Sequence, residues 1–283
     1  MKPYRLGLYE KSMPNTLSLC QKLAETKAGG FDYLELSVDE TEEKLARLDW
    51  GDAEISALRR AMEETGVPIH SICLSGHRRF PLGDPDPAVR QKSLAIMEGA
   101  LALASRLGVR IIQLAGYDVY YKSGDAATRK LFGENLTLSV SMAAREGVIL
   151  AFETMETPFM DTVEKAVFWV NQINSPYLQV YPDSGNLTNA ALIYGTRSVS
   201  ADLETGRGHL AALHLKETRP GIYREVPYGT GHVDFPAAAG TALALGVRMF
   251  VGEFWHTGEH NWREILKENN RFLRNVLDTA ANC

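Results

Sequence analysis

Eight short apolar runs alternate with helix-like segments along the chain, and this alternation constrains the fold more than any other feature. Runs such as VRIIQLA and VILAFE are too apolar for a sheet with one face in water, so they fit parallel strands covered on both faces. A helix-like segment follows each run, and the last of these spans Trp262–Asp278. The expected strands are Arg5–Tyr9, Phe31–Ser37, Pro68–Ser75, Arg110–Ala115, Val148–Thr154, Leu178–Pro182, Leu210–Lys216 and Arg248–Phe254.

A glycine followed by an apolar residue marks the boundary between helix and strand five times. The glycine suits a helix C-cap, where a left-handed backbone is needed, and the apolar residue begins the next buried strand. The pairs are Gly30-Phe31, Gly66-Val67, Gly108-Val109, Gly147-Val148 and Gly246-Val247. Eight alternating units predict a single (β/α)8 barrel over residues 1–283. A doubly wound sheet is the alternative, but it usually has a Gly-rich turn after its first strand, and that turn here reads YEKSMPN.

Composition excludes several classes of protein. A hydrophobic content of 45% in 283 residues is enough for one large core. The net charge of -5 and pI of about 5.9 argue against a nucleic-acid partner. No run approaches the ~20 apolar residues of a membrane span, and the N-terminus lacks a signal-peptide core, so we expect a cytoplasmic protein. Three widely spaced cysteines indicate neither a disulfide framework nor a thiolate zinc site.

Each of the last four expected strands carries a possible metal ligand at its C-terminal end: Glu153, Asp183, His214 and Glu253. Strand ends of this kind meet at one mouth of a barrel. A lone carboxylate there would often be a loop cap, but three crowded carboxylates repel each other and a divalent cation relieves that repulsion. Carboxylates with one imidazole favour Zn²⁺, with Mn²⁺ or Co²⁺ as alternatives. His209, which we place at the entrance of its strand, is interpreted as structural.

A metal flanked by two glutamates suits proton transfer on a sugar. If the C2 carbonyl and C3 hydroxyl of a ketose both bind the cation, the C3 proton becomes acidic because the enediolate is stabilised. One of Glu153 and Glu253 then removes that proton, and the other returns a proton to the opposite face. The pattern therefore predicts epimerisation at C3 without redox chemistry.

Basic residues fall in the loops that follow the expected strands. Near a barrel mouth, such cations can hold a phosphate, although any one of them alone could equally be a solvated or capping cation. The candidates are Arg78, Arg79, Lys216 and Arg219. His77 either contacts substrate or caps backbone groups, and Tyr120 and Tyr121 either wall the pocket or only pack at the rim.

At these residues the chain resembles the L-ribulose-5-phosphate 3-epimerases, also called L-xylulose-5-phosphate 3-epimerases, of bacterial L-ascorbate and related pentose breakdown. That family belongs to the xylose-isomerase-like TIM barrels. The resemblance extends over nearly the whole chain. It is carried by GLYEKSMP, LELSVDETEEKLARLDW, CLSGHRRFPLG, IQLAGYDVYY, YPDSGNL, HLKETRPG and VPYGTGHVDF.

The resemblance implies that the four strand-end residues hold the metal, that the two glutamates are the acid–base pair, and that the substrate carries a phosphate. Related enzymes that act on free sugars have a His three residues after the metal Asp, near the substrate. This chain has Asn186 there, which joins the substrate-binding candidates. Where the family pattern reads HVKD, this chain reads HLKE, with Glu217 in place of Asp.

The leading hypothesis is interconversion of L-ribulose 5-phosphate and L-xylulose 5-phosphate. A sugar-phosphate aldose–ketose isomerase of the hexulose-6-phosphate type would use the same site. An endonuclease IV-like DNA repair enzyme would need three zinc ions and more His ligands, and a non-catalytic sugar-binding protein would need no metal. The expected partner is a ketopentose phosphate. Similar barrels often dimerise, so a homodimer is a possible assembly, although no exposed apolar stripe in the sequence requires one.

Overall fold

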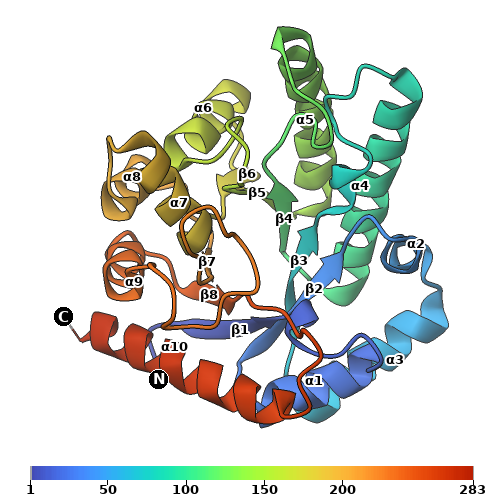
Figure 1. Ribbon diagram of the computed structural model, residues 1–283. Helices are drawn as coiled ribbons and strands as arrows, with labels where there is room; N and C mark the ends of the chain where they lie inside the picture. Colours follow the sequence, from blue (N-terminus) through green and yellow to red (C-terminus); the bar gives the residue numbers. More distant parts are fainter. Residues whose placement is uncertain (1, 283) are drawn as a thin grey trace.

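The computed structural model describes residues 2–282, in which eight parallel strands curl into a barrel with the helices outside it (Figure 1). The predicted (β/α)8 fold is thus confirmed. Neighbouring strands follow the order β6-β5-β4-β3-β2-β1-β8-β7. The strands are β1 (Arg5–Tyr9), β2 (Tyr33–Val38), β3 (Ile69–Leu74), β4 (Ile111–Ala115), β5 (Ile149–Glu153), β6 (Leu178–Val180), β7 (Leu213–Leu215) and β8 (Met249–Gly252).

Backbone hydrogen bonds join the two ends of this sheet beside the mouth. The Val180 N–H donates to the carbonyl of His209 at 2.9 Å, and the His214 N–H donates to the carbonyl of Pro182 at 2.9 Å. An isolated parallel bridge pairs Asp183 with His214 directly. The seam between β6 and β7 therefore brings two of the predicted ligands side by side.

Helices follow the strands and cover the outside of the sheet (Figure 1). The α-helices are α1 (Leu19–Ala28), α2 (Glu42–Leu45), α3 (Asp52–Thr65), α4 (Pro87–Leu107), α5 (Ala126–Glu146), α6 (Val163–Ile173), α7 (Ser184–Tyr194), α8 (Val199–Thr205), α9 (Phe235–Ala244) and α10 (Trp262–Ala281). Short 3₁₀ turns are η1 (Glu10–Ser12), η2 (Ala46–Asp49) and η3 (Gly76–Arg78). Within residues 2–282, no helix is both long and apolar enough to cross a membrane.

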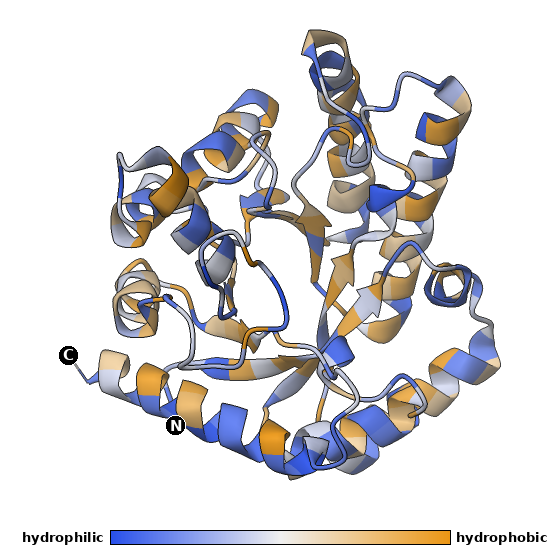
Figure 2. Ribbon diagram, in the orientation of Figure 1, coloured by the Kyte–Doolittle hydropathy of each residue, from blue (hydrophilic) through white to orange (hydrophobic). Residues whose placement is uncertain are grey.

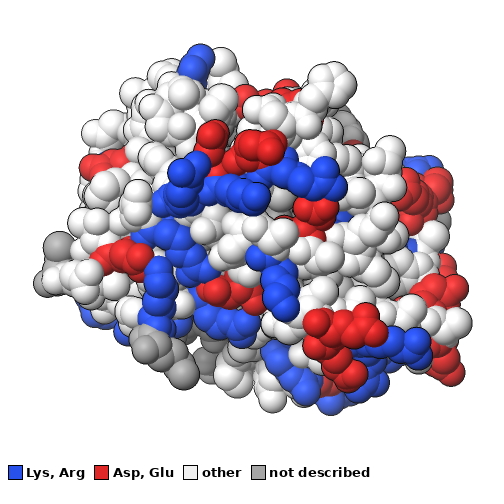
Figure 3. Space-filling model, turned by 90° about the horizontal axis from the view of Figure 1, so that it is seen from below, with Lys and Arg blue, Asp and Glu red and all other residues white. Residues whose placement is uncertain are grey.

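The helices alternate polar and apolar residues while the strands at the centre are mainly apolar (Figure 2). In α10 the buried residues Leu266, Leu273 and Leu277 lie on one helical face. The opposite face is polar, and at the edge of the buried face Arg263 of α10 forms an ion pair with Glu25 of α1 at 2.7 Å. Figure 3 views this side of the molecule and shows basic and acidic side chains lying next to each other.

Three of the five predicted glycine C-caps are confirmed. Gly66, Gly108 and Gly147 are the C-caps of α3, α4 and α5, with φ of 69°, 75° and 65°. Gly30 and Gly246 have the expected positive φ, 84° and 92°, but each lies one residue after the C-cap, which is Gly29 in α1 and Leu245 in α9. Each predicted strand overlaps an observed one, but most observed strands are shorter. The prediction exceeds the observation most at Leu210–Lys216, where β7 has three residues because only isolated bridges pair its start with β6.

Side chains inside the barrel come from alternate residues of each strand. Along β2, Leu34 and Leu36 join the apolar core packed against the helices, whereas Tyr33 belongs to a separate inner cluster. Glu35 lies two residues after Tyr33 and therefore shares its inward face. It is paired in register with Tyr9 of β1, whose side chain belongs to the same inner cluster. The pleat thus places one buried carboxylate inside the barrel, beneath the strand ends.

Candidate functional site

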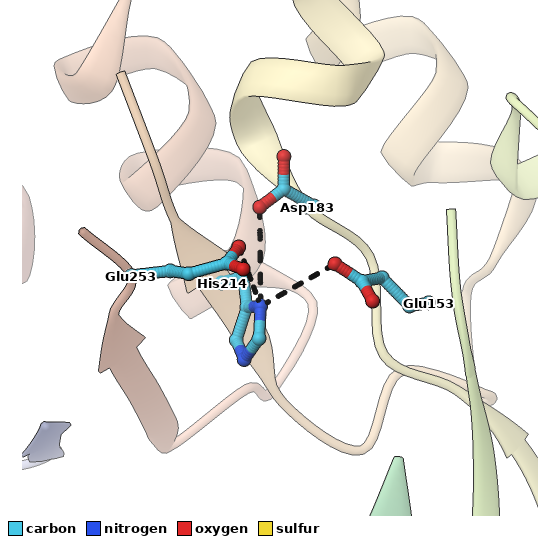
Figure 4. A group of neighbouring side chains, drawn as sticks. All are labelled: Glu153, Asp183, His214 and Glu253. Atoms are coloured by element: carbon cyan, nitrogen blue, oxygen red, sulfur yellow. Dashed lines mark hydrogen bonds and ion pairs between the residues drawn. The ribbon is translucent and has the colours of Figure 1, made fainter. Parts of the chain in front are cut away.

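The four predicted ligands meet at the C-terminal mouth of the barrel (Figure 4). Glu153 ends β5, Asp183 is the N-cap of α7, His214 is in β7 and Glu253 directly follows β8. One ligand atom from each residue lies within 4.8 Å of the others, and all four side chains are buried. His214 Nδ1 lies 3.0 Å from Glu253 Oε2, 3.6 Å from Glu153 Oε1 and 3.9 Å from Asp183 Oδ2. The two glutamates approach this nitrogen from opposite sides (Figure 4).

The two carboxylate oxygens of Asp183 have different surroundings. Oδ1 accepts a hydrogen bond from the backbone N–H of Asn186 at 2.6 Å, which caps α7. Oδ2 is buried and has no hydrogen-bond partner within residues 2–282. Leaving a buried carboxylate oxygen unpaired is costly. Since Oδ2 is also the atom that faces His214, the donor set fits a divalent cation.

The pKa shifts in the cluster reflect the burial and mutual repulsion of its three carboxylates. Burial raises the pKa of Glu153, and the neighbouring charge of Glu253 raises it further. Burial also raises the pKa of Asp183 well above its ordinary value. Burial opposes ionisation of Glu253 too, but Lys216 and His214 outweigh it and hold the pKa of Glu253 well below the usual range. Lys216 and His214 therefore do not fully stabilise the negative charge of the three carboxylates, and a bound cation would reduce the remaining repulsion.

Lys216 lies inside this cluster, whereas the sequence suggested a loop position suited to a phosphate. Its Nζ is 3.2 Å from Asp183 Oδ1 and 3.5 Å from Glu253 Oε2, and the residue is 4% exposed. Burial would lower the pKa of Lys216, but the charges of Asp183 and Glu253 raise it instead. Lys216 therefore remains a cation and partly balances the charge of the carboxylates.

The sequence reasoning missed Glu35, which holds the other nitrogen of the histidine. Glu35 Oε1 lies 2.7 Å from His214 Nε2, while Glu35 Oε2 accepts hydrogen bonds from Ser71 at 2.7 Å and Tyr181 at 3.0 Å. A carboxylate that holds the far side of an imidazole fixes the orientation of the ring and leaves Nδ1 for the site. The signal in the sequence was a single acidic residue within the apolar run YLELSV.

Asn186 lies in the first turn of α7, next to Asp183. Its Nδ2 donates to the carbonyl of Thr154 at 2.7 Å, and its Oδ1 is buried without a partner within the described chain. The structure thus places a fixed amide with a free acceptor beside the cluster. Its role in substrate binding stays a prediction.

The remaining predicted residues separate in the structure. Arg78 is mostly buried, and its guanidinium lies 4.7 Å from the ring centre of Tyr120. Arg79 is exposed and pairs with Glu42 at 2.6 Å. Arg219 is also exposed, and it donates to the carbonyl and hydroxyl oxygens of Thr230. Adjacent basic residues in the sequence therefore do not form one basic cluster.

His77 is 3% exposed, and its Nε2 lies 3.1 Å from the carbonyl of Ser93 in α4. Burial lowers the pKa of His77 to about 4, so the ring is neutral at physiological pH. The sequence left substrate contact and backbone capping as alternatives for His77, and the structure shows the contact with a backbone carbonyl.

Comparisons with known proteins show which family the chain is similar to. The model of the family described as "Xylose isomerase-like TIM barrel" matches residues 23–276. L-ribulose-5-phosphate 3-epimerase UlaE of Shigella sonnei (strain Ss046) is 43% identical over 268 residues, which cover 94% of this chain and 93% of that protein. The same figures hold for L-ribulose-5-phosphate 3-epimerase UlaE of Escherichia coli O157:H7.

Solved structures share the fold at low sequence identity. A structure of L-ribulose 3-epimerase has a TM-score of 0.78 at 18% identity, over 99% of this chain and 96% of that one. D-allulose 3-epimerase from Methylomonas sp., in complex with D-allulose, has a TM-score of 0.78 at 15% identity, over 98% of both chains. The expected resemblance to the L-ribulose-5-phosphate 3-epimerases is confirmed, and the chain belongs to the xylose isomerase-like TIM barrel family.

Proposed function

We propose that this chain is a metal-dependent carbohydrate epimerase that interconverts L-ribulose 5-phosphate and L-xylulose 5-phosphate by inversion at C3. Relatives named L-ribulose-5-phosphate 3-epimerase match nearly the whole chain at 43% identity. The observation that carries the mechanism is the placement of Glu153 and Glu253 on opposite sides of His214 Nδ1, within one buried acidic cluster (Figure 4).

Glu153, Asp183, His214 and Glu253 would hold the divalent cation, and the unpartnered Oδ2 of Asp183 supports this assignment. Three carboxylates and one imidazole favour Zn²⁺, with Mn²⁺ and Co²⁺ next. A cation bound there supplies positive charge that polarises the C2 carbonyl of a ketose.

The residues of the chain supply the proton transfers. One of Glu153 and Glu253 removes the proton from C3, and the other delivers a proton to the opposite face of the same carbon. This exchange inverts C3 and leaves the oxidation state of the sugar unchanged. Lys216, 3.5 Å from Glu253 Oε2, keeps a positive charge beside one member of the pair. Glu35 keeps the ring of His214 in place.

The test is turnover of L-ribulose 5-phosphate in D₂O with purified, metal-loaded protein. We expect L-xylulose 5-phosphate as the product, with deuterium at C3 in the NMR spectrum. An aldose phosphate would show that the proton moves between C1 and C2, which is the isomerase reaction. Turnover without any solvent deuterium at C3 would rule out the two-glutamate mechanism.

Glu35→Gln should weaken metal binding about 10- to 100-fold while the barrel stays folded, because the variant keeps the shape of the side chain but loses the charge that orients His214. Competition with a chromophoric chelator measures the affinity, and thermal unfolding of the metal-free proteins reports on the fold. Glu146→Gln, on the exposed end of α5, is the matched control. If Glu35 is only structural, the melting temperature will fall and the metal affinity will not change.

A further inference from the structure

The partners of one buried carboxylate, in the loop 216–234 between β7 and α9, are backbone N–H groups. Glu217 is 3% exposed, and its two oxygens accept hydrogen bonds from Thr218 at 3.1 Å, Gly229 at 3.0 Å and Val233 at 3.2 Å. Two of these donors lie 12 and 16 residues further along the chain. A single side chain therefore holds the end of the loop against its beginning.

The segment 229–233 lies tightly around this carboxylate. A Cβ on Gly231 would overlap Glu217 Oε1 and the carbonyl oxygen of Thr218. The N–H of His232 donates to that same carbonyl at 3.0 Å. The glycine in the middle of the segment thus lets the backbone come close enough to donate hydrogen bonds to the carboxylate.

The residue before Gly229 connects this loop to the strands that carry two of the candidate ligands. The hydroxyl of Tyr228 donates to the carbonyl of Leu215, the last residue of β7. The same carbonyl accepts the backbone N–H of Glu253 at 3.0 Å, and the Tyr228 hydroxyl lies 3.4 Å from the carbonyl oxygen of Glu253. The ring of Tyr228 also packs edge-on against Phe254, with centroids 5.8 Å apart. Tyr228 therefore bridges β7 and β8 at the point where Glu253 follows the strand.

A second side chain reaches the same segment of the loop. Arg219 donates to the carbonyl and hydroxyl oxygens of Thr230, both at 3.1 Å. Arg219 is exposed, so water competes for these hydrogen bonds, whereas those of Glu217 are shielded from water and are made to a carboxylate. Arg224 holds an earlier part of the loop to the loop that follows β5. We therefore expect Glu217 to contribute most to the position of Tyr228.

We propose that Glu217 is a positioning residue of the active site. It holds the loop 216–234 so that Tyr228 secures the ends of β7 and β8, and it thereby fixes Glu253 and His214. The proposal rests on the proposed epimerase function and assigns Glu217 no contact with substrate or metal. In the sequence, this residue differs from the family pattern HVKD, which has Asp there.

Glu217→Gln tests the loop directly, because the amide has one acceptor oxygen and no charge. In the metal-free protein, peptide-resolved amide hydrogen exchange should become about 10-fold faster or more within residues 217–234 and stay unchanged in β2, β3 and β4. Glu225→Gln makes the same change at an exposed glutamate of this loop, and as the matched control it should leave exchange unaltered. Unchanged exchange in Glu217→Gln, or faster exchange spread evenly over the barrel, would overturn the positioning role.

Turnover of L-ribulose 5-phosphate by metal-loaded protein tests the connection through Tyr228. Glu217→Gln and Tyr228→Phe should each lower kcat by about 10- to 100-fold with a smaller change in KM, because a shift of about 1 Å in a catalytic group costs up to ~100-fold in rate. The double variant should lose no more than the larger single loss, since both substitutions break one connection. Losses that multiply would overturn the connection.

Glu217→Asp separates charge from reach. It keeps the carboxylate but shortens the side chain by one methylene, so it should restore only part of the exchange protection and part of kcat. A Glu217→Asp variant no better than Glu217→Gln in both measurements would contradict a role for the charge. If the unmodified protein does not epimerise L-ribulose 5-phosphate, the proposed function fails, and the exchange measurement on metal-free protein still decides whether Glu217 holds the loop.

Discussion

Replacing either Glu153 or Glu253 by glutamine should lower kcat for C3 epimerisation by roughly 1,000-fold or more, because general acid–base catalysis by a positioned side chain contributes factors of about 10² to 10⁴. An amide of the same shape can neither accept nor return the C3 proton. Deuterium incorporation from solvent, followed by NMR, should vanish together with turnover. Either variant that retains the full rate would remove its glutamate from the proton transfers.

Loss of a metal ligand could produce the same loss of activity, so the metal content of each variant must be measured. Asp183→Asn is the matched comparison, because Asp183 is proposed as a ligand but not as an acid or base. A glutamate variant that keeps its metal and loses exchange identifies a proton-transfer residue, whereas one that loses both resembles Asp183→Asn. Glu146→Gln, far from the mouth on α5, should be unaffected.

Replacing Glu153 by glutamine should not destabilise the metal-free protein. Burial and the charge of Glu253 raise the pKa of Glu153, so its ionised form is disfavoured in the folded state. The substitution removes the charge of Glu153 and so relieves repulsion among the carboxylates. We therefore expect the thermal unfolding temperature of metal-free Glu153→Gln to equal or exceed that of the unmodified protein.

Removal of the divalent cation should abolish epimerase activity and lower stability. Without a cation, the compensating charge beside the three carboxylates comes from His214 and Lys216. A ligand that binds only the folded state at about 100 times its dissociation constant stabilises it by roughly 2.7 kcal/mol. Chelation followed by gel filtration should therefore lower the unfolding temperature, and added Zn²⁺, Mn²⁺ or Co²⁺ should restore both properties.

Two measurements make this expectation decisive. Elemental analysis must show that the treated protein is free of metal, and Asp183→Asn should show a much smaller response to chelator and added ion. Metal-free protein that keeps its activity and its unfolding temperature would contradict the metal assignment. The cluster would then be an ion-pair network centred on His214 and Lys216.

The barrel could be predicted from the sequence because its signals are local. An apolar run between helical patterns must be covered on both faces, and a glycine with positive φ ends several of the helices, as at Gly66 and Gly108. Strand ends were less predictable, as the three-residue β7 shows. The length of a strand depends on pairing with a neighbour that the local sequence does not identify.

The four candidate ligands could be predicted because a barrel gathers the C-terminal ends of its strands at one mouth. Their positions in the sequence were therefore enough to predict that Glu153, Asp183, His214 and Glu253 lie close together. The loop residues could not be assigned in this way. Arg78 and Arg79 are adjacent in the chain, yet one lies mostly buried against Tyr120 and the other is exposed and paired with Glu42.

The sequence by itself determined the eightfold alternation and the residues at the ends of the last four strands, because both follow from periodicity within short segments. Only the tertiary structure decided which side chains surround them. Glu35 contacts His214 across 179 residues of chain. Arg224 contacts Glu156 across 68 residues, and Tyr120 donates a hydrogen bond to the same carboxylate. Such contacts depend on the curvature of the sheet and on the paths of the loops. Both arise from the packing of the whole molecule, so no single segment of the sequence encodes them.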